Sequence, residues 1–439
     1  MDIVLDKISQ TEALIKINLK EKDYQPKVEE KIKEYSKKAN IKGFRPGKVP
    51  TGLIKKMYGK SILVDEVNHM LSHSVMDYIK ENDIQILGEP LPNVEKAAEI
   101  DWDNATEFDF EYSIGIANEF ELTLDKKLKV DSMNIKVDDQ VINETLDNLK
   151  QQFGTTTNPE IAEEGDSLYG EFSIEGEEEP ATGSLNFSEL DKKDIKKFIG
   201  KKKDDEIIFN PLKIIKNEEH RNAFLGENAN SVSGDITFKV KNVNRVVPAE
   251  VNQDLFDKTF GPDVVTSEAE FIEKIKESIS SNYEMESNNY LDLKIREKLI
   301  EKAKITLPDE FLKRWIEVAN KNNISKEEIE RDYEHYSNDL KWTLIKNKIS
   351  KQHDIKAEHE DVVNEAKALI RMQFASSGLG SQLEDSIDTF ADNYLKGNEG
   401  DNYMKLHEKV FNDKILAFIK ENVTIKNKEV SAEEFRKKA

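Results

Sequence analysis

The spacing of apolar residues changes twice along these 439 residues, and the changes divide the chain into parts of different architecture. Up to about residue 116, strand-like alternation and helical periodicity are mixed. From Gly154 to Val247, glycines and turn residues separate short alternating runs, which is typical of a small β-rich domain. From residue 248 helical periods dominate. We therefore expect an α+β multidomain fold with an α+β domain over 1–116, a connector over 117–153 that joins the helical domain, a β-rich domain over 154–247 and an all-α domain over 248–439.

Composition favours an elongated molecule over a single large globule. Hydrophobic residues make up 37% of the chain and charged residues 35%. A compact globule of this length usually carries a larger apolar share, because more of its residues lie in a core. An elongated molecule with much surface per residue is therefore expected.

The first domain shows the strongest local patterns. Thr11 to Lys20 alternates and predicts a strand with Ala13, Ile15, Ile17 and Leu19 on one face. Asp23 is expected to cap a helix that reaches about Ala39, with Pro26 in its first turn. Two glycines and two prolines predict a constrained loop over Asn40 to Pro50. The remaining expected elements are helices over 51–58 and 61–81 and a strand over 107–116.

Capping signals mark the later helices. Asp138 is expected to cap a helix to about Gln152, after a strand at Val130 to Val137. Ser325 and Glu328 have the spacing of a capping box. Further helices are expected over 268–304, from Pro308 and over 401–422, with a helix broken at Gly378 and Gly380. The charged tail, 426–439, is expected to fray.

Charge is distributed unevenly. The segment from Lys16 to Lys60 carries 14 lysines or arginines against five acids, a net charge of +9. The whole chain has a net charge of -22, so the remainder carries -31. Such acidity argues against a general nucleic-acid coat, whereas a basic island in an acidic chain indicates local docking on phosphate. A solvated helix face is the alternative explanation for the lysines.

Several classes of protein are excluded. The chain has no cysteine, so disulfides and cysteine-based metal sites are impossible. It lacks an apolar run of the roughly 18 residues that a membrane helix needs, and its first residues do not form a signal peptide. His69 and His73 have helical spacing but no third ligand, so we expect no metal site. With no nucleotide motif and no catalytic constellation, we expect no cofactor, no membrane partner and a cytoplasmic protein.

The loop Gly43-Phe44-Arg45-Pro46-Gly47-Lys48-Val49-Pro50 resembles the signature of trigger factor, a family of ribosome-associated bacterial chaperones. The order of domains along the whole chain is similar to that family as well, and this similarity implies that the helical domain is split. Two further stretches carry the resemblance, 247–261 with Asp254-Leu255-Phe256-Asp257-Lys258, and Leu307-Pro308-Asp309-Glu310-Phe311 at the start of a helix.

The resemblance implies a ribosome-binding role for the loop. Its expected site residues are Gly43, Phe44, Arg45, Pro46, Gly47 and Lys48, and the implied partners are a ribosomal protein and rRNA of the large subunit near the exit tunnel. The glycines permit a tight turn, the prolines lower the ordering cost, Phe44 is a plausible anchor, and Arg45 and Lys48 can contact phosphate. Many relatives have a basic residue where this chain has Pro46, so one charge is missing here.

The resemblance also implies that 154–247 is an FK506-binding-type (FKBP-type) prolyl isomerase domain. Phe172 falls at an aromatic position of its pocket, as a remnant of that site. Two other aromatic positions fall at Asp194 and near Glu219, so the pocket is expected to be degenerate, and we assign no catalytic residue.

The function predicted from the sequence is an ATP-independent chaperone that binds nascent or unfolded polypeptides. Apolar stripes in the helical domain predict either bundle packing or a groove for clients, with Phe374 and Phe390 as candidate client contacts. Two alternatives stay open, an active prolyl isomerase acting on nascent chains and an RNA-binding or assembly factor that uses 16–60. A homodimer away from the ribosome is also compatible with the resemblance.

Overall fold

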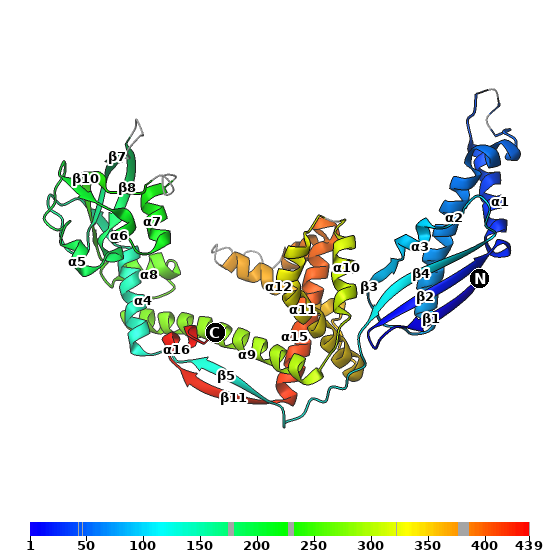
Figure 1. Ribbon diagram of the computed structural model, residues 1–439. Helices are drawn as coiled ribbons and strands as arrows, with labels where there is room; N and C mark the ends of the chain where they lie inside the picture. The colour runs from blue at the N-terminus through cyan, green and yellow to red at the C-terminus, as the bar shows by residue number, and fades with distance from the viewer. Residues whose placement is uncertain are drawn as a thin grey trace. The chain divides into compact units, whose positions relative to one another are not determined.

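The computed structural model describes residues 1–42, 44–45, 47–173, 180–226, 232–321, 323–375 and 386–438. They form two compact units, each made of two stretches of chain. These are Met1–Ser132 with Leu291–Lys426, and Met133–Tyr290 with Asn427–Ala439. The chain therefore passes between the units at three points (Figure 1). The expected combination of an α+β part, a small β-rich part and a helical part is confirmed.

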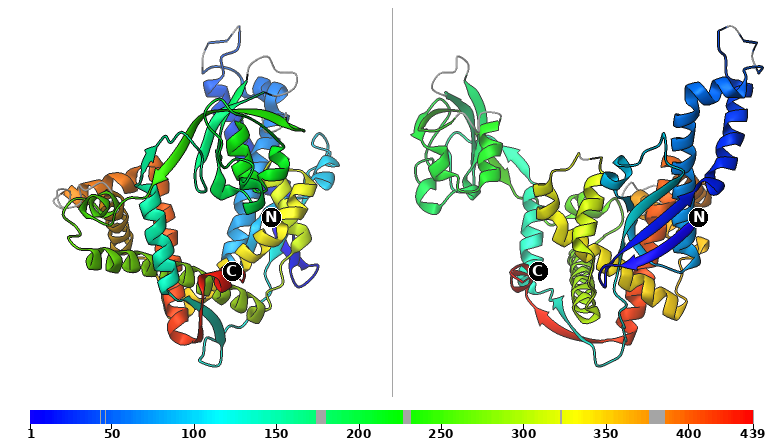
Figure 2. Two further views of the ribbon diagram at one scale, coloured as in Figure 1. Left: turned by 90° about the vertical axis from the view of Figure 1, so that its left-hand side faces the viewer. Right: turned by 45° about the vertical axis from the view of Figure 1, so that its right-hand side comes forward.

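The first unit begins with a four-stranded antiparallel sheet in the order β1-β2-β4-β3. Alternation places Ala13, Ile15, Ile17 and Leu19 of β2 in the core, as predicted from the sequence. Two long helices supply the other side of this core, and Figure 2 (right) shows them extending beyond the sheet. The elements are β1 (Asp2–Lys7), β2 (Glu12–Lys20), α1 (Glu21–Lys38), α2 (Thr51–Glu81), β3 (Ile86–Pro92), α3 (Val94–Ala98) and β4 (Glu107–Ile116).

Two expected helix boundaries were wrong. Helix α1 begins at Glu21, so Asp23 lies inside the first turn, where its carboxylate accepts the backbone N–H of Lys20 at 3.1 Å. Helix α2 is continuous, although Gly59 suggested a break. A glycine inside a helix costs about 1 kcal/mol, but Ile54 and Ile62 on either side are buried in the same core and hold the helix together.

The rest of the first unit is helical. Its main core contains Leu299, Phe311, Trp342 and Ile415, and the Ser325 capping box of α11 is formed as predicted. The expected break at Gly378 and Gly380 lies outside the described residues. The helices are the C-terminal part of α9 (Glu268–Ala303), α10 (Asp309–Ala319), α11 (Lys326–His353), α12 (His359–Ala375), α14 (Ile387–Lys396), the 3-10 turn η4 (Asn398–Gly400) and α15 (Asp401–Asn422).

The connector after β4 is fixed to these helices by lysines that donate to backbone carbonyls. Lys348 donates to the carbonyl of Phe120, and Lys302 donates to that of Thr123 at 2.7 Å. Lys126, within the connector, donates to the carbonyl of Val423 at the end of α15 at 3.0 Å. A lysine at a helix C-terminus also interacts favourably with the helix dipole.

The second unit contains a β-rich domain whose five strands run in the order β6-β10-β7-β8, with β9 paired to β10 (Figure 2, left). Six phenylalanines dominate its core: Phe172, Phe187, Phe198, Phe209, Phe224 and Phe238. Its elements are β6 (Thr155–Thr157), β7 (Ser167–Ser173), β8 (Ala181–Asn186), η1 (Phe187–Glu189), α5 (Lys192–Ile195), β9 (Glu206–Phe209), α6 (Pro211–Ile214), α7 (Glu218–Leu225) and β10 (Ile236–Val247).

A buried ion pair ties the start of β7 to β10. Asp166 is 1% exposed and receives two hydrogen bonds from Arg245, at 2.8 and 2.9 Å, and one from the backbone of Glu163 at 2.7 Å. Burial alone would raise the pKa of Asp166, but these hydrogen bonds outweigh it and hold the pKa below its usual value.

The remaining part of the second unit is built from α4 (Asp139–Gln152), α8 (Gln253–Phe260) and the N-terminal part of α9. Asp138 caps α4 by accepting the N–H of Val141, as predicted. The expected fraying of the tail was wrong. Strand β11 (Thr424–Val430) pairs with β5 (Lys129–Ile135), and Phe435 of α16 (Ala432–Arg436) is buried against Met133.

Candidate functional sites

The loop between α1 and α2 is anchored at both ends. The N–H of Ala39 donates to the carbonyl of Tyr35 at 2.7 Å, which closes the end of α1. The hydroxyl of Ser36 donates to the carbonyl of Val49 at 2.5 Å, and Val49 itself is only 3% exposed. The two ends of the loop are therefore held together where α1 ends and α2 begins (Figure 1).

The described residues inside this loop are folded into turns with their side chains outward. The N–H of Phe44 donates to Ile41, and that of Lys48 donates to Arg45, each at 3.0 Å. Gly47 has a φ of +78°, a left-handed conformation that a side chain would strain. Phe44 is 40% exposed, and Arg45 and Lys48 are exposed too. The other two predicted residues, Gly43 and Pro46, lie outside the described residues.

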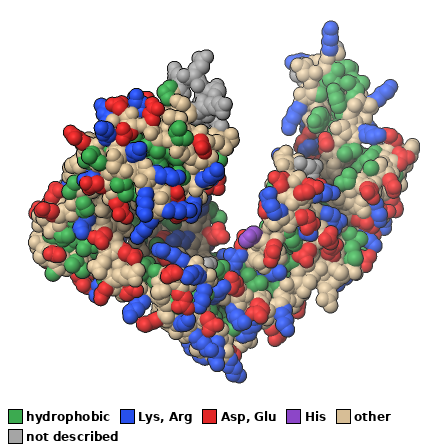
Figure 3. Space-filling model, turned by 60° about the vertical axis from the view of Figure 1, so that its left-hand side comes forward, with side chains coloured by type: hydrophobic (Ala, Val, Ile, Leu, Met, Phe, Trp, Pro, Cys, Tyr) green, Lys and Arg blue, Asp and Glu red, His purple; other side chains and the backbone are tan. Residues whose placement is uncertain are grey.

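Aromatic and cationic side chains surround this loop. Tyr35 of α1 and Tyr58 of α2 form a ring pair with centroids 6.4 Å apart, and both are more than 40% exposed. Figure 3 shows hydrophobic side chains gathered near this end of the molecule with lysine and arginine at the margin. Among the described residues, the nearby cations form no ion pair; they are Lys37, Lys38, Lys42, Arg45, Lys48, Lys55 and Lys56. Their charge is available to an anionic partner.

The pocket residue expected in the β-rich domain lies in its core. Phe172 is completely buried and stacks on Phe224, with ring centroids 5.2 Å apart. Asp194 lies in α5, 3.9 Å from Lys197, and Glu219 is exposed in the first turn of α7. Two of the three positions therefore carry acidic side chains, and the aromatic ring at the third is enclosed in the core.

Phe374 and Phe390, from α12 and α14, contact each other beside a small helical core, with their ring planes tilted by 47°. Their ring centroids are 5.8 Å apart. Phe374 is half-buried against the cluster that contains Ile370 and Ala391, whereas Phe390 is 37% exposed. Met372, which lies on α12 with Phe374, is 70% exposed. The pair therefore contributes to packing and also presents apolar surface.

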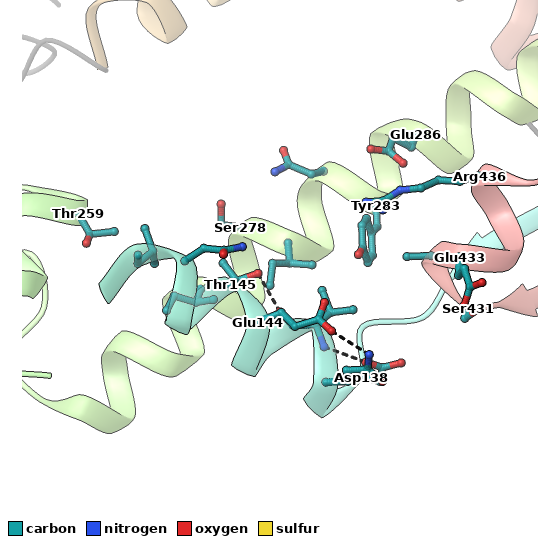
Figure 4. Close-up of a pocket in the computed structure, with 18 of the residues that line it drawn as sticks. Asp138, Glu144, Thr145, Thr259, Ser278, Tyr283, Glu286, Ser431, Glu433 and Arg436 are labelled. Carbon is teal, nitrogen blue, oxygen red and sulfur yellow. Dashed lines mark hydrogen bonds between the residues drawn. The ribbon is translucent and has the colours of Figure 1, made fainter. Parts of the chain in front are cut away.

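A cavity of about 880 Å³ lies between α4, α8, α9 and α16 in the second unit. Sequence reasoning did not find it, because its wall includes the tail expected to fray. Apolar side chains such as Leu149, Ile275 and Ile279 form part of its lining, and acids including Glu144 and Glu286 stand among them (Figure 4). Burial raises the pKa of Tyr283, toward which Arg436 points (Figure 4).

The described ranges contain neither a metal-binding cluster nor a helix that could span a membrane. Within them, no three His, Asp or Glu side chains come together to hold a metal ion. His69 and His73 contact each other, with ring centroids 4.6 Å apart. No helix in these ranges combines the length and hydropathy needed to cross a bilayer.

Comparisons with known proteins agree along nearly the whole chain. Residues 1–149 match the family model "Bacterial trigger factor protein (TF)", 156–248 match "Probable trigger factor, FKBP-like domain", and 287–438 match "Probable trigger factor, C-terminal domain". The chain belongs to the trigger factor family.

Individual relatives are distant in sequence. The trigger factor of Azospirillum brasilense is 23% identical over 96% of this chain and 95% of its own, and that of Chloroherpeton thalassium is 23% identical over 97% of both. The trigger factor of Corynebacterium jeikeium is 25% identical, but its alignment covers 71% of this chain and 58% of that protein. A solved structure titled "Promiscuous Substrate Recognition in Folding and Assembly Activities of the Trigger Factor Chaperone" aligns over 95% of this chain with 17% identity and a TM-score of 0.47.

Membership of the trigger factor family agrees with the loop signature from which the resemblance was first inferred. The site residues are not tested by these matches, so the loop, the Phe172 remnant and the phenylalanine pair stay predictions.

Proposed function

We propose that this member of the trigger factor family is an ATP-independent chaperone that docks on the large ribosomal subunit through the loop between α1 and α2. The main support is that Phe44 and Arg45 are exposed on a loop whose two ends are held together by the Ser36–Val49 hydrogen bond. Its partners are a ribosomal protein and rRNA near the exit tunnel. In this role the protein is cytoplasmic and binds nascent chains as they emerge from the exit tunnel.

The loop has the properties of a preorganised anchor. Because the Ser36–Val49 hydrogen bond and the internal turns already order the backbone, binding requires little further loss of conformational entropy. Phe44 would bury apolar surface at the centre of the contact, where aromatic residues contribute most. Arg45 and Lys48 would meet phosphates or carboxylates at its edge, which adds a salt-dependent attraction.

Client binding is proposed for apolar side chains that the helices leave exposed. Phe390, Met372 and the neighbouring Phe374 form such a group. Small, separated apolar surfaces give weak contacts with rapid release, whereas the surrounding charges keep the chaperone soluble. The mode of action needs no nucleotide.

The docking proposal is tested by co-sedimentation with large ribosomal subunits at moderate salt. The full chain carrying Phe44→Ala, Arg45→Ala and Lys48→Ala is expected to stay in the supernatant, because the anchor and both charges are gone. Binding of the unaltered chain is expected to weaken as salt rises.

A matched control removes one exposed apolar side chain and two cations elsewhere in the same domain, with Val94→Ala, Lys27→Ala and Lys33→Ala. This variant should pellet with the subunits as the unaltered chain does. Equal co-sedimentation of the loop variant and the control would show that the loop is not the docking site.

A further inference from the structure

A second lysine-rich segment lies in the β-rich domain, far along the sequence from the docking loop. Residues 192–203 contain seven lysines and a single acid, a net charge of +6 in a chain whose total is -22. The lysines are Lys192, Lys193, Lys196, Lys197, Lys201, Lys202 and Lys203. All are exposed except Lys201, which is half-buried.

The fold turns these lysines outward on a rigid base. Ile195 and Phe198 point into the core of the domain, so the neighbouring positions of the turn face solvent. Gly200, with a φ of +79°, reverses the chain, and its N–H donates to the carbonyl of Ala162 at 2.8 Å. The N–H of Asp204 donates to Val240 of β10 at 2.8 Å, which fixes the far end of the second lysine run.

The two runs of lysine form one surface because little chain separates them. Four residue steps lead from Lys197 to Lys201, which span at most about 14 Å even when extended. The hydrogen bond from the N–H of Lys201 to the carbonyl of Phe198 shortens that path further. We call the exposed lysines of 192–203 the lysine surface.

Most of this charge is not neutralised within the protein. Among the described residues, only Lys197 of the lysine surface has an ion-pair partner, Asp194, at a long 3.9 Å. Two flanking acids pair with lysines outside the surface, Asp191 with Lys216 and Asp204 with Lys239. Asp205 accepts the N–H of Lys202 but keeps its negative charge, and Glu206 follows it. The surface therefore keeps a net positive charge, which these two acids reduce at its C-terminal end.

We propose that the lysine surface binds the phosphate backbone of double-helical RNA, as a second contact independent of the docking loop. All seven cations are lysines, which act as point charges suited to spaced phosphates, whereas carboxylates on a protein partner favour the planar fork of arginine. The only aromatic residue in the segment, Phe198, is buried, so no side chain of the segment can stack on unpaired bases. Duplex RNA is recognised mainly through phosphates and shape, which needs no such stacking.

The test measures binding of a fluorescent RNA hairpin with a stem of about 20 base pairs, the length scale of a duplex-binding surface. It uses the full chain that already carries the three alanine changes in the docking loop, so failure of the loop proposal cannot affect the result. The variant adds Lys193→Gln, Lys196→Gln, Lys202→Gln and Lys203→Gln, which lie on the exposed surface and leave the core unchanged.

A control with the same loss of charge replaces four lysines of α9 that each pair with a glutamate three residues away. They are Lys274, Lys276, Lys294 and Lys298, each changed to glutamine. Amide hydrogen exchange of the β-rich domain must match the parent in both variants before binding is compared.

We expect the lysine-surface variant to bind the hairpin about tenfold more weakly or worse at 50 mM salt. The slope of log affinity against log salt should fall by about one for each lysine that contacts a phosphate. The α9 control should bind as the parent does. Equal affinities of the lysine-surface variant and the α9 control for the hairpin would overturn the proposal. Polyglutamate that displaces the hairpin as efficiently as unlabelled duplex does would also overturn it, because this result would indicate an acidic protein partner.

Discussion

Removal of the negative charge of Asp166 is expected to loosen the β-rich domain without changing its shape. In Asp166→Asn, an NH2 group that cannot accept replaces one of the two oxygens that receive hydrogen bonds from Arg245, and the negative charge is lost at an almost completely buried site. Breaking a buried ion pair by removing one partner typically costs 3–5 kcal/mol. Arg245 is 30% exposed and keeps Glu163 at 2.9 Å, so its charge remains partly solvated and paired. We therefore expect a loss of about 2–3 kcal/mol.

Native-state amide hydrogen exchange of the full chain measures this loss locally. Peptides that cover β7 and β10 should exchange about 30- to 150-fold faster in the variant, since 1.4 kcal/mol corresponds to a factor of ten. Peptides from the N-terminal sheet serve as an internal reference and should not change. Glu163→Gln is the matched control, because Glu163 contacts the same guanidinium from an exposed position and such pairs contribute at most about 1 kcal/mol.

The effect should depend on pH in a defined direction. The pKa of Asp166 is lowered in the folded state, so its contribution is complete above the unfolded pKa of about 3.9 and is lost as pH falls through the lower folded pKa. The difference between the parent and Asp166→Asn should thus be constant near neutrality and shrink below about pH 4. If Asp166→Asn exchanged no faster than Glu163→Gln at neutral pH, the buried pair would not stabilise this domain as argued.

Two further predictions concern function. The double variant Phe374→Glu, Phe390→Glu should suppress aggregation of a denatured client at least severalfold less well, because charge replaces apolar contact surface. Val94→Glu, which places the same charge at an exposed site elsewhere, is the control. If the folded double variant protected clients fully, the two phenylalanines would be packing residues only. The full chain should accelerate cis/trans exchange of a proline peptide weakly or not at all, because Phe172 is buried in the core and cannot line an open pocket. Acceleration comparable to that of an active prolyl isomerase would refute this prediction and assign the β-rich domain an enzymatic role.

Local patterns in the sequence predicted the local parts of the fold. The alternation around Ile15 gave the correct face of β2, and the caps at Asp138 and Ser325 gave the correct starts of α4 and α11, because each signal is contained within a few residues. The exposure of Phe44 could likewise be expected from a loop of glycine and proline. Burial of Phe172 could not, since it depends on Phe224, more than 50 residues away in the chain.

The errors came from partners that are distant in the sequence. Strand β11 is mostly polar, and only pairing with β5, almost 300 residues earlier, orders it. The pocket beside α9 was missed for the same reason, because Glu433 and Arg436 of the tail form part of its wall. The lysine surface is visible in the sequence as a local excess of charge, but only the structure shows that, among the described residues, Lys197 alone of its lysines has an ion-pair partner.

The two stretches of the first unit, 1–132 and 291–426, are synthesised at different times, so its parts fold at different times. All four strands of the N-terminal sheet and the helices that cover it are contained in the first 116 residues, so this domain can fold while the rest is still being translated. The helical core instead joins Leu128 to Leu291 and Val423, and it cannot close until nearly the whole chain has been made. At about 5–20 residues per second, the remaining 300 or so residues take roughly 15–60 s to synthesise. A folded N-terminal domain is therefore tethered to an unfinished helical core throughout that interval, and closure of the core is a late step of high contact order.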